Sequence, residues 1–198
     1  MTNAAVLRKH ILTSRNGLSS TEITEKSLAI QQVLLTLDHI RGSQSIFIYV
    51  SFRSEVMTLD LINKLIEMGK TVTVPITRVQ EKRLDIIQIT NPATDLQPGY
   101  CNIPEPKEEL CHTNQIAPEA IETVIFPGSV FDERGGRFGY GGGYYDRLLA
   151  VIAKAARIGL AFDLQIVERA PLSAHDQILD LVVTETRIIP GRNQEQRR

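Results

Sequence analysis

A strand, a helix and a second strand follow one another within about thirty residues in the first half of the chain. The β-rich run 45–51 is followed by an amphipathic segment, 59–68, and by a second β-rich run, 71–75. Thr58 is placed to cap the start of the helix, and Gly69 closes it. A helical crossover of this kind joins parallel strands, because an antiparallel pair needs only a short turn. The pattern therefore predicts an α/β fold.

The remaining segments continue the alternation of helices and strands. Apolar spacing predicts helices over 3–15, from Ser20 to Leu37 and over 144–156, and strands over 84–89, 122–127, 157–162 and 179–184. The run 122–127 is almost wholly apolar, which is typical of a central buried strand. The run 84–89 is polar on one side and is expected near an edge of the sheet. Five prolines between 91 and 118 predict a long surface excursion.

The composition fits a single globular domain over residues 1–198. The chain is 42% hydrophobic and 23% charged, and a chain of this length can bury roughly 70% of its unfolded surface. The polar tail 191–198 is expected to fray. The formal net charge of -1 provides no basic footprint for nucleic acid or for an anionic membrane. We therefore expect neither as a partner.

The N-terminal residues and the cysteines favour a cytoplasmic location. Arg8 and Lys9 carry charge where a secretory signal has its apolar segment. No apolar run approaches the ~20 residues that span a bilayer. Cys101 and Cys111 lack the spacing of a zinc site, so we expect two free thiols in a reducing compartment.

Glycine is concentrated in one segment of the chain. Seven of the 13 glycines fall between Gly128 and Gly143, after the expected central strand and before an expected helix. Glycines in such a junction let backbone N–H groups approach a phosphate, and the following helix adds its dipole. The segment matches neither the Walker pattern nor the dinucleotide fingerprint. A flexible turn would need only one or two glycines, so this cluster, with Arg137 beside it, favours anion binding.

Three carboxylates lie where strands give way to loops or helices. Asp146 falls in the first turn of the helix after the glycines, where it could simply complement the helix dipole. Asp176 follows His175 in a loop before the last strand. If the two loops meet at the strand ends, Asp146 and Asp176 could hold Mg²⁺. Glu55 also lies in a strand-to-helix loop. Two interpretations of it stay open, a solvated surface charge and a functional group.

The order of motifs along the chain identifies a family. The motifs are Leu7-Arg8 with Arg15 and Leu18-Ser19; Tyr49-Val50-Ser51 with Glu55-Val56 and Thr58; Gly69-Lys70 and Pro75; Ile103-Pro104-Glu105-Pro106; Pro127-Gly128; Phe131-Asp132; Gly136 through Arg147; Ile158 through Phe162 with Gln165; His175-Asp176; and Val183-Thr184-Glu185. With these motifs, nearly the whole chain resembles the 5-formyltetrahydrofolate cyclo-ligases, also called methenyltetrahydrofolate synthetases. We accordingly expect a three-layer sandwich around a mostly parallel sheet, of isomerase/CoA-transferase-like architecture.

The resemblance implies an ATP-dependent ring closure that requires Mg²⁺. In the family scheme the formyl oxygen of 5-formyltetrahydrofolate attacks the γ-phosphate of ATP, N10 closes on the activated carbon, and phosphate departs. The products are 5,10-methenyltetrahydrofolate, ADP and phosphate. Such a phosphoryl transfer is catalysed mostly by positioning and charge neutralisation.

The resemblance also assigns site residues, by position. It implies ATP contacts at Ala4, Ala5, Val6, Leu7, Arg8, Arg137, Phe138, Gly139, Tyr140, Gly141, Gly142, Gly143, Tyr144 and Tyr145. It implies folate contacts at Arg8, Val50, Glu55, Tyr140, Gly141, Gly142, Gly143 and Tyr144, and metal contacts at Asp146 and Asp176. Glu55 is expected to orient the pterin and the reacting nitrogens, and Tyr144 to donate a hydrogen bond near the formyl group; both are the expected catalytic residues.

Two positions depart from the family pattern. Members often have a basic residue where this chain has Ala4, and many have lysine at the position of Gly142. The chain therefore lacks two phosphate-directed charges, which bears on its affinity for ATP. Two other functions stay open: a non-catalytic nucleotide- or folate-binding module, and a sugar-phosphate isomerase or transferase of related α/β architecture. We expect a monomer whose partners are small molecules.

Overall fold

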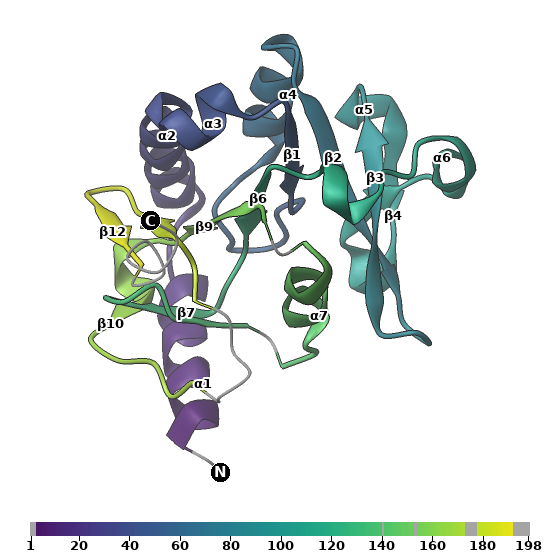
Figure 1. The fold of residues 1–198 in the computed structure, drawn as a ribbon. Coiled ribbons are helices and arrows are strands. Elements are labelled where there is room, and N and C mark those ends of the chain that lie inside the picture. The colour runs from purple at the N-terminus through teal and green to yellow at the C-terminus, as the bar shows by residue number, and fades with distance from the viewer. Residues whose placement is uncertain (1–2, 140, 153, 173–177, 192–198) are drawn as a thin grey trace.

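The computed structural model describes residues 3–139, 141–152, 154–172 and 178–191. Its centre is a sheet of seven strands in the order β12-β11-β9-β6-β1-β2-β3 (Figure 1). The strands are β1 (Ser45–Ile48), β2 (Thr71–Arg78), β3 (Arg83–Ile89), β6 (Thr123–Phe126), β9 (Ala156–Leu160), β11 (Leu181–Val183) and β12 (Ile188–Pro190). The five inner strands are parallel, and the two outermost strands pair antiparallel with their neighbours. The expected mostly parallel sheet is confirmed, with a fully buried β6 at its centre and β3 at its edge.

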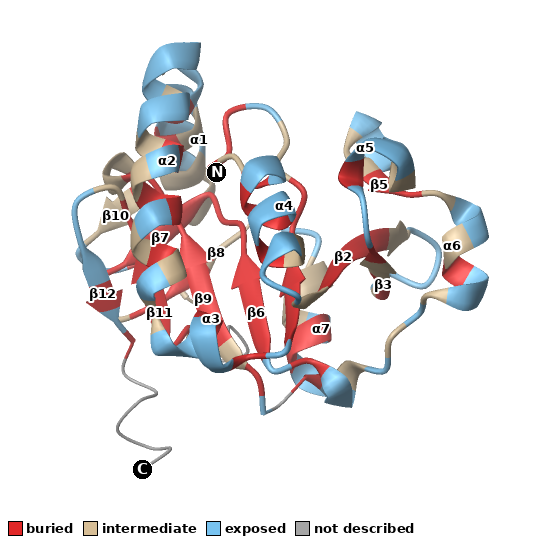
Figure 2. Ribbon diagram, turned by 90° about the horizontal axis from the view of Figure 1, so that it is seen from above, coloured by how far each residue is buried: buried red, intermediate tan, exposed pale blue. Residues whose placement is uncertain are grey.

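Helices cover both faces of this sheet. The helices on one face are α2 (Ser20–Thr36), α3 (Asp38–Gly42) and α4 (Leu59–Glu67), and the opposite face carries α7 (Tyr144–Val151) (Figures 1 and 2). One apolar cluster includes Leu34 of α2 and Leu65 of α4, and a second includes Leu149 of α7. The three-layer arrangement is therefore confirmed. None of the helices in the described part of the chain is long and apolar enough to cross a bilayer.

A small second sheet lies beside the N-terminal helix. Helix α1 (Asn3–Asn16) contacts the short helix η3 (Asp163–Gln165) and lies near strands β7 (Val130–Asp132) and β10 (Ile166–Val167) in both views (Figures 1 and 2). Strand β7 pairs parallel with β10 and antiparallel with β8 (Arg137–Phe138). Both β7 and β8 fall within the glycine-rich segment, which is therefore partly regular and not one continuous loop.

The proline-rich stretch contains more structure than its composition predicts. It forms α5 (Pro92–Asp95), β4 (Leu96–Pro98), η1 (Tyr100–Asn102), β5 (Pro104–Pro106), α6 (Glu108–Thr113) and η2 (Pro118–Ala120). Strands β4 and β5 pair antiparallel. The buried carboxylate of Glu105 accepts hydrogen bonds from the backbone nitrogens of Thr77, 3.0 Å away, and Tyr100, 3.2 Å away. These bonds attach the hairpin to the end of β2.

Two local predictions are wrong. The helix expected over 144–156 ends at Val151, and Ala156 instead begins β9. Thr58 stands at the N-cap of α4, but its side chain caps no helical N–H group. The Thr58 hydroxyl instead donates to the Tyr49 carbonyl at 2.8 Å and accepts from the Ser51 nitrogen at 2.9 Å. It therefore fixes the loop that leaves β1.

Candidate active site

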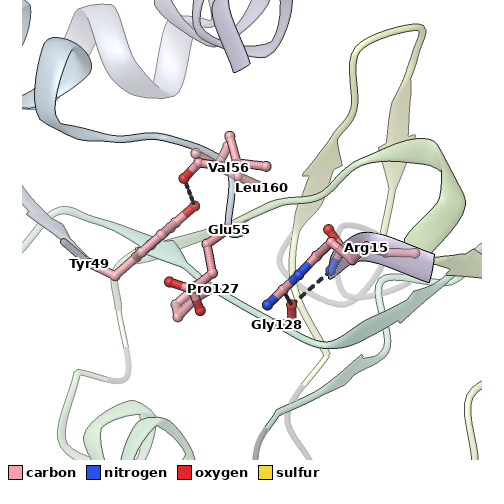
Figure 3. Close-up of a pocket in the computed structure, with 8 residues that line it drawn as sticks. Arg15, Tyr49, Glu55, Val56, Pro127, Gly128 and Leu160 are labelled. Carbon is pink, nitrogen blue, oxygen red and sulfur yellow. Dashed lines mark hydrogen bonds between the residues drawn. The ribbon is translucent and has the colours of Figure 1, made fainter. Parts of the chain in front are cut away.

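A narrow pocket lies at the carboxyl ends of β1, β6 and β9, the edge of a parallel sheet where ligands usually bind. Its lining residues are Arg15, Tyr49, Glu55, Val56, Pro127, Gly128, Leu160 and Gln165 (Figure 3). Its empty volume is about 140 Å³, a figure that includes space open to solvent. In this form the pocket could hold only part of a nucleotide or folate, because pockets for small ligands begin at roughly 300 Å³.

Glu55 is held in this pocket by a turn of its own loop. Its side chain accepts a hydrogen bond from the Phe52 nitrogen at 3.0 Å, and its own nitrogen donates to the Phe52 carbonyl at 3.3 Å. The residue is only 8% exposed. The nearby Tyr49 hydroxyl donates to the Val56 carbonyl at 2.8 Å. The structure therefore favours a buried, oriented carboxylate over the solvated charge that the sequence left open.

Arg15 enters the same pocket from helix α1. The residue is 3% exposed, and its Nε donates to the Ser54 hydroxyl at 3.1 Å. Its Nη1 donates to the Gly128 carbonyl, also at 3.1 Å. Gln165 Nε2 donates to that carbonyl as well, at 2.8 Å. The Gly128 carbonyl is thus a common anchor for α1 and for the segment that follows β9.

The first part of the glycine segment is a tight hairpin built around Asp132. This fully buried carboxylate accepts hydrogen bonds from the backbone nitrogens of Arg134, Gly136 and Ala170 and from the Arg134 guanidinium. Burial alone would raise the pKa of Asp132, but these hydrogen bonds outweigh it and hold the pKa below its usual range. Gly135, at a φ of 82°, closes the turn.

Arg137 connects the glycine segment to the helix that follows it. Its Nη2 lies 2.9 Å from Asp146 Oδ1, and its Nη1 donates to the Pro127 carbonyl at 3.4 Å. The guanidinium carbon lies 5.5 Å from the ring centre of Phe126 and 5.6 Å from that of Tyr145. The Arg137 side chain is 4% exposed, whereas that of Asp146 is 34% exposed. Arg137 is therefore a buried positive charge, and Asp146 faces partly outward.

The second part of the glycine segment approaches Arg8. The Arg8 guanidinium carbon lies 4.2 Å above the ring centre of Phe138. A Cβ built on Gly141 would lie 3.6 Å from both terminal nitrogens of Arg8. Gly141 and Gly143 have φ values of 94° and 66°, and Gly143 is the N-cap of α7. A guanidinium, a glycine loop and a helix N-terminus thus converge, a combination that suits phosphate.

Tyr144 and Tyr145 face different surroundings at the start of α7. A Cβ on Gly142 would meet the Tyr144 ring at 2.8 Å, and Arg147 lies over that ring at 5.4 Å. Arg147 Nη2 also donates to the Gly142 carbonyl at 2.7 Å. The Tyr145 ring instead packs edge-on against Phe126, with their centres 5.7 Å apart. The Tyr144 ring thus lies against Gly142 of the glycine loop, and the Tyr145 ring lies against the core.

The structure brings together some of the expected site residues. Arg8 meets Phe138 and Gly141, and Arg137 meets Asp146. Glu55 lies in the same loop as the buried Val50, which follows the end of β1. Residues 4–7 form the first turns of α1. Tyr144 does not line the pocket that holds Glu55. Tyr140 and Asp176 lie outside the described residues, so the expected pairing of Asp146 with Asp176 stays a prediction.

Glu55 is the one lining residue of this pocket that was among the expected site residues, and the others include two long polar side chains, Arg15 and Gln165. The available signal for Arg15 was its position seven residues after Arg8, which puts the two cations on one side of a helix. Gln165 stood in the sequence only as part of a family motif. Its contact with Gly128 joins segments 37 residues apart, and local pattern gives no signal for such a contact.

Comparisons with known proteins point to one family. The family model described as the 5-formyltetrahydrofolate cyclo-ligase family matches residues 1–185. The 5-formyltetrahydrofolate cyclo-ligase of Mus musculus is 28% identical over 186 residues, covering 90% of this chain and 92% of the mouse protein. The enzyme of the same name from Escherichia coli strain K12 is 28% identical over 176 residues, covering 88% of this chain and 96% of its own.

Solved structures give the same result for the fold. The 5,10-methenyltetrahydrofolate synthetase of Aquifex aeolicus superposes with a TM-score of 0.84 at 30% identity, covering 96% of this chain and 94% of that one. The synthetase of Mycoplasma pneumoniae has a TM-score of 0.74 at 23% identity, covering 93% of this chain and 99% of its own, and supports the fold alone.

Proposed function

Because the chain belongs to the 5-formyltetrahydrofolate cyclo-ligase family and is thus a ligase, we propose that it converts 5-formyltetrahydrofolate and ATP into 5,10-methenyltetrahydrofolate, ADP and phosphate, with Mg²⁺ required. One observation carries the proposal. Helix α1 brings Arg8 to the glycine loop and Arg15 to the pocket of Glu55. Helix α1 therefore contacts both a loop that suits phosphate and the pocket of a buried carboxylate, which is an arrangement that can align ATP with a second substrate.

The nucleotide side of the proposed site is the loop 139–143 with Arg8 and Arg137. In this proposal the backbone nitrogens of the loop and the start of α7 bind the phosphates. Arg8 offers a buried Nε that has no hydrogen-bond partner among the described residues, and Arg137 offers another. Ala4 and Gly142 supply no charge, so these two guanidiniums take most of the neutralising role. Residues 4–7, Tyr144 and Tyr145 complete the proposed ATP contacts.

The folate side is the pocket with Glu55. Its carboxylate would accept hydrogen bonds from the pterin and so fix the reacting nitrogens, while Val50 supplies an apolar contact. The hydroxyl of Tyr144 would donate to the formyl oxygen. The formyl oxygen attacks the γ-phosphate and displaces ADP, N10 then closes on the activated carbon and gives up its proton, and the former formyl oxygen leaves as part of phosphate. The protein contributes alignment of the two substrates and neutralisation of the transferred charge.

Asp146 and Asp176 are the proposed holders of Mg²⁺. The donor type fits, because Mg²⁺ prefers carboxylate oxygens and keeps several waters. Asp146 is partly exposed, and Arg137 occupies only its Oδ1 among the described contacts. When bound, the ion would neutralise charge on the β- and γ-phosphates.

The proposal is tested by following the ultraviolet absorbance of the methenyl product. Purified protein with 5-formyltetrahydrofolate should generate that chromophore only when ATP and Mg²⁺ are both present. Binding of either substrate with no chromophore under any condition would point to a non-catalytic module and overturn the proposal. Turnover of sugar phosphates without ATP would indicate the isomerase or transferase alternative. We also propose that the enzyme acts as a cytoplasmic monomer. Gel filtration with light scattering tests its oligomeric state.

A further inference from the structure

Arg15 joins three parts of the chain that carry the proposed site. It belongs to α1, it donates to Ser54 in the loop after β1, and it donates to Gly128 at the start of the glycine segment. Ser54 immediately precedes Glu55 in the chain. In Figure 3 the Arg15 guanidinium and the Glu55 side chain both line the same pocket, which they enter from different segments of the chain. A buried arginine with this set of contacts fixes where the carboxylate loop stands relative to the glycine segment.

Arg8 places the same helix against the other end of that segment. Arg8 and Arg15 are seven residues apart, which on an α-helix is two turns, or roughly 10 Å of rise. Arg8 contacts Phe138 and Gly141, near the far end of the glycine segment, whereas Arg15 contacts Gly128, its first glycine. Helix α1 thus spans the distance between the phosphate-binding loop and the Glu55 pocket, and its rigidity sets that distance.

We propose that Arg15 is a positioning residue for Glu55, holding its carboxylate at a fixed place relative to the glycine loop so that folate binds in line with the nucleotide. The inference rests on the proposed function. Arg15 itself needs no contact with either substrate. A planar guanidinium donates from Nε to Ser54 and from Nη1 to Gly128 in one fixed plane, whereas a lysine ammonium is a point charge on a flexible stem and does not reproduce that geometry. Loss of that geometry therefore acts through Glu55.

A double-mutant cycle tests this coupling. Arg15→Lys and Glu55→Gln are made singly and together, and the Kd for 5-formyltetrahydrofolate is measured by calorimetry without ATP, with kcat and KM where turnover is detectable. In the wild-type background Arg15→Lys should raise the Kd about tenfold, within the range of measured couplings. In the Glu55→Gln background the same change should alter the Kd less than about twofold, because the carboxylate that Arg15 positions is gone.

Two further variants serve as checks. Ser54→Ala removes one acceptor of Arg15 while leaving the arginine in place, so it should weaken folate binding only when Glu55 is present. If Arg15→Lys does not fold, Ser54→Ala takes its place in the comparison of the two backgrounds. Arg157→Lys is the matched control, because Arg157 is a buried arginine, 6% exposed, at the opposite ends of the parallel strands, on β9. It should leave the Kd unchanged.

The outcomes separate the inference from the proposed function. A wild-type protein that neither binds 5-formyltetrahydrofolate nor forms product overturns the proposed function, and the positioning role with it. If the wild-type protein binds 5-formyltetrahydrofolate and Arg15→Lys raises the Kd equally in both backgrounds, the positioning role alone is overturned. If Arg15→Lys and Arg157→Lys raise the Kd for 5-formyltetrahydrofolate equally, Arg15 is only a general contributor to folding, and the positioning role is overturned.

Discussion

At the residue scale, a substitution of Asp146 decides whether this carboxylate is a metal ligand or only a charge at the start of a helix. Asp146→Asn keeps an oxygen for Arg137 Nη2, 2.9 Å away in the native protein, but removes the negative charge that Mg²⁺ needs. We expect the Mg²⁺ concentration for half-maximal rate to rise at least about tenfold, with the melting temperature nearly unchanged. The measurement is initial rate against Mg²⁺ concentration at saturating ATP and folate.

A matched control for Asp146 is available on another helix. Asp60 is an exposed acidic residue in the first turn of α4, so Asp60→Asn removes a comparable charge from a helix N-terminus. It should leave the Mg²⁺ dependence unaltered. If the two variants behave alike, Asp146 only complements the dipole of α7.

Gly128 shows how closely the site is packed against the core. A Cβ at this position would lie 2.4 Å from Cζ and 2.7 Å from Cε2 of Phe131, a fully buried ring. Gly128→Ala should therefore lower the free energy of unfolding by about 1–3 kcal/mol through overpacking, and should displace the carbonyl that Arg15 uses. Urea denaturation measures the first effect. Gly42→Ala, where a Cβ meets nothing within 4 Å, should leave stability unchanged or slightly higher.

At the element scale, long periodic segments could be predicted and short ones could not. The helix predicted over 59–68 is α4, and the apolar run 122–127 contains β6, because burial of one helical face or of a whole strand leaves a strong pattern. Strands β7, β8 and β10 have two or three residues each and leave no periodic signal. Tertiary pairing alone defines them, since β10 pairs with β7 across 35 positions of sequence.

The candidate site follows the same division. Arg137, Glu55 and Asp146 could be chosen from the sequence because they lie at junctions of strands, loops and helices, whereas Arg8 lies inside α1 and was indicated by the resemblance to the family. That Arg137 is buried against Phe126 and Tyr145, and not displayed to solvent, depends on how α7 docks on the sheet. The sequence shows residue types and their local spacing. It does not show where a side chain points, because that depends on contacts between distant segments.

The contribution of the β7–β8 hairpin to the free energy of unfolding has a predictable dependence on pH. The pKa of Asp132 is lowered in the folded protein, so its carboxylate stabilises the fold at pH values above the unfolded pKa of about 4. That contribution is lost as the pH falls through the lower, folded pKa. Asp132→Asn should cost about 2 kcal/mol at neutral pH. Urea midpoints from pH 7 to about 3 should then fall more steeply for the wild type than for the variant; parallel curves would contradict this assignment.

At the scale of the whole molecule, one sheet connects both apolar layers. Strand β6 supplies Ile125 to the cluster under α2 and α4 and supplies Val124 and Phe126 to the cluster under α7. The loops that carry Glu55 and the glycine segment leave the same edge of this sheet. The two clusters therefore share a backbone, and distortion of either one reaches the site through β1 and β6.

This shared sheet predicts a single unfolding transition for the chain. Leu34→Ala on α2 and Leu149→Ala on α7 remove side chains that are 0% and 1% exposed, one on each face. Each should cost about 2–5 kcal/mol and should shift the whole transition, followed in urea by circular dichroism and by tyrosine fluorescence. Because β6 contributes to both layers, neither face can lose its packing while the other keeps its central strand. Two resolved transitions, each moved by only one of the variants, would show that the layers unfold as separate units and would contradict a one-domain chain.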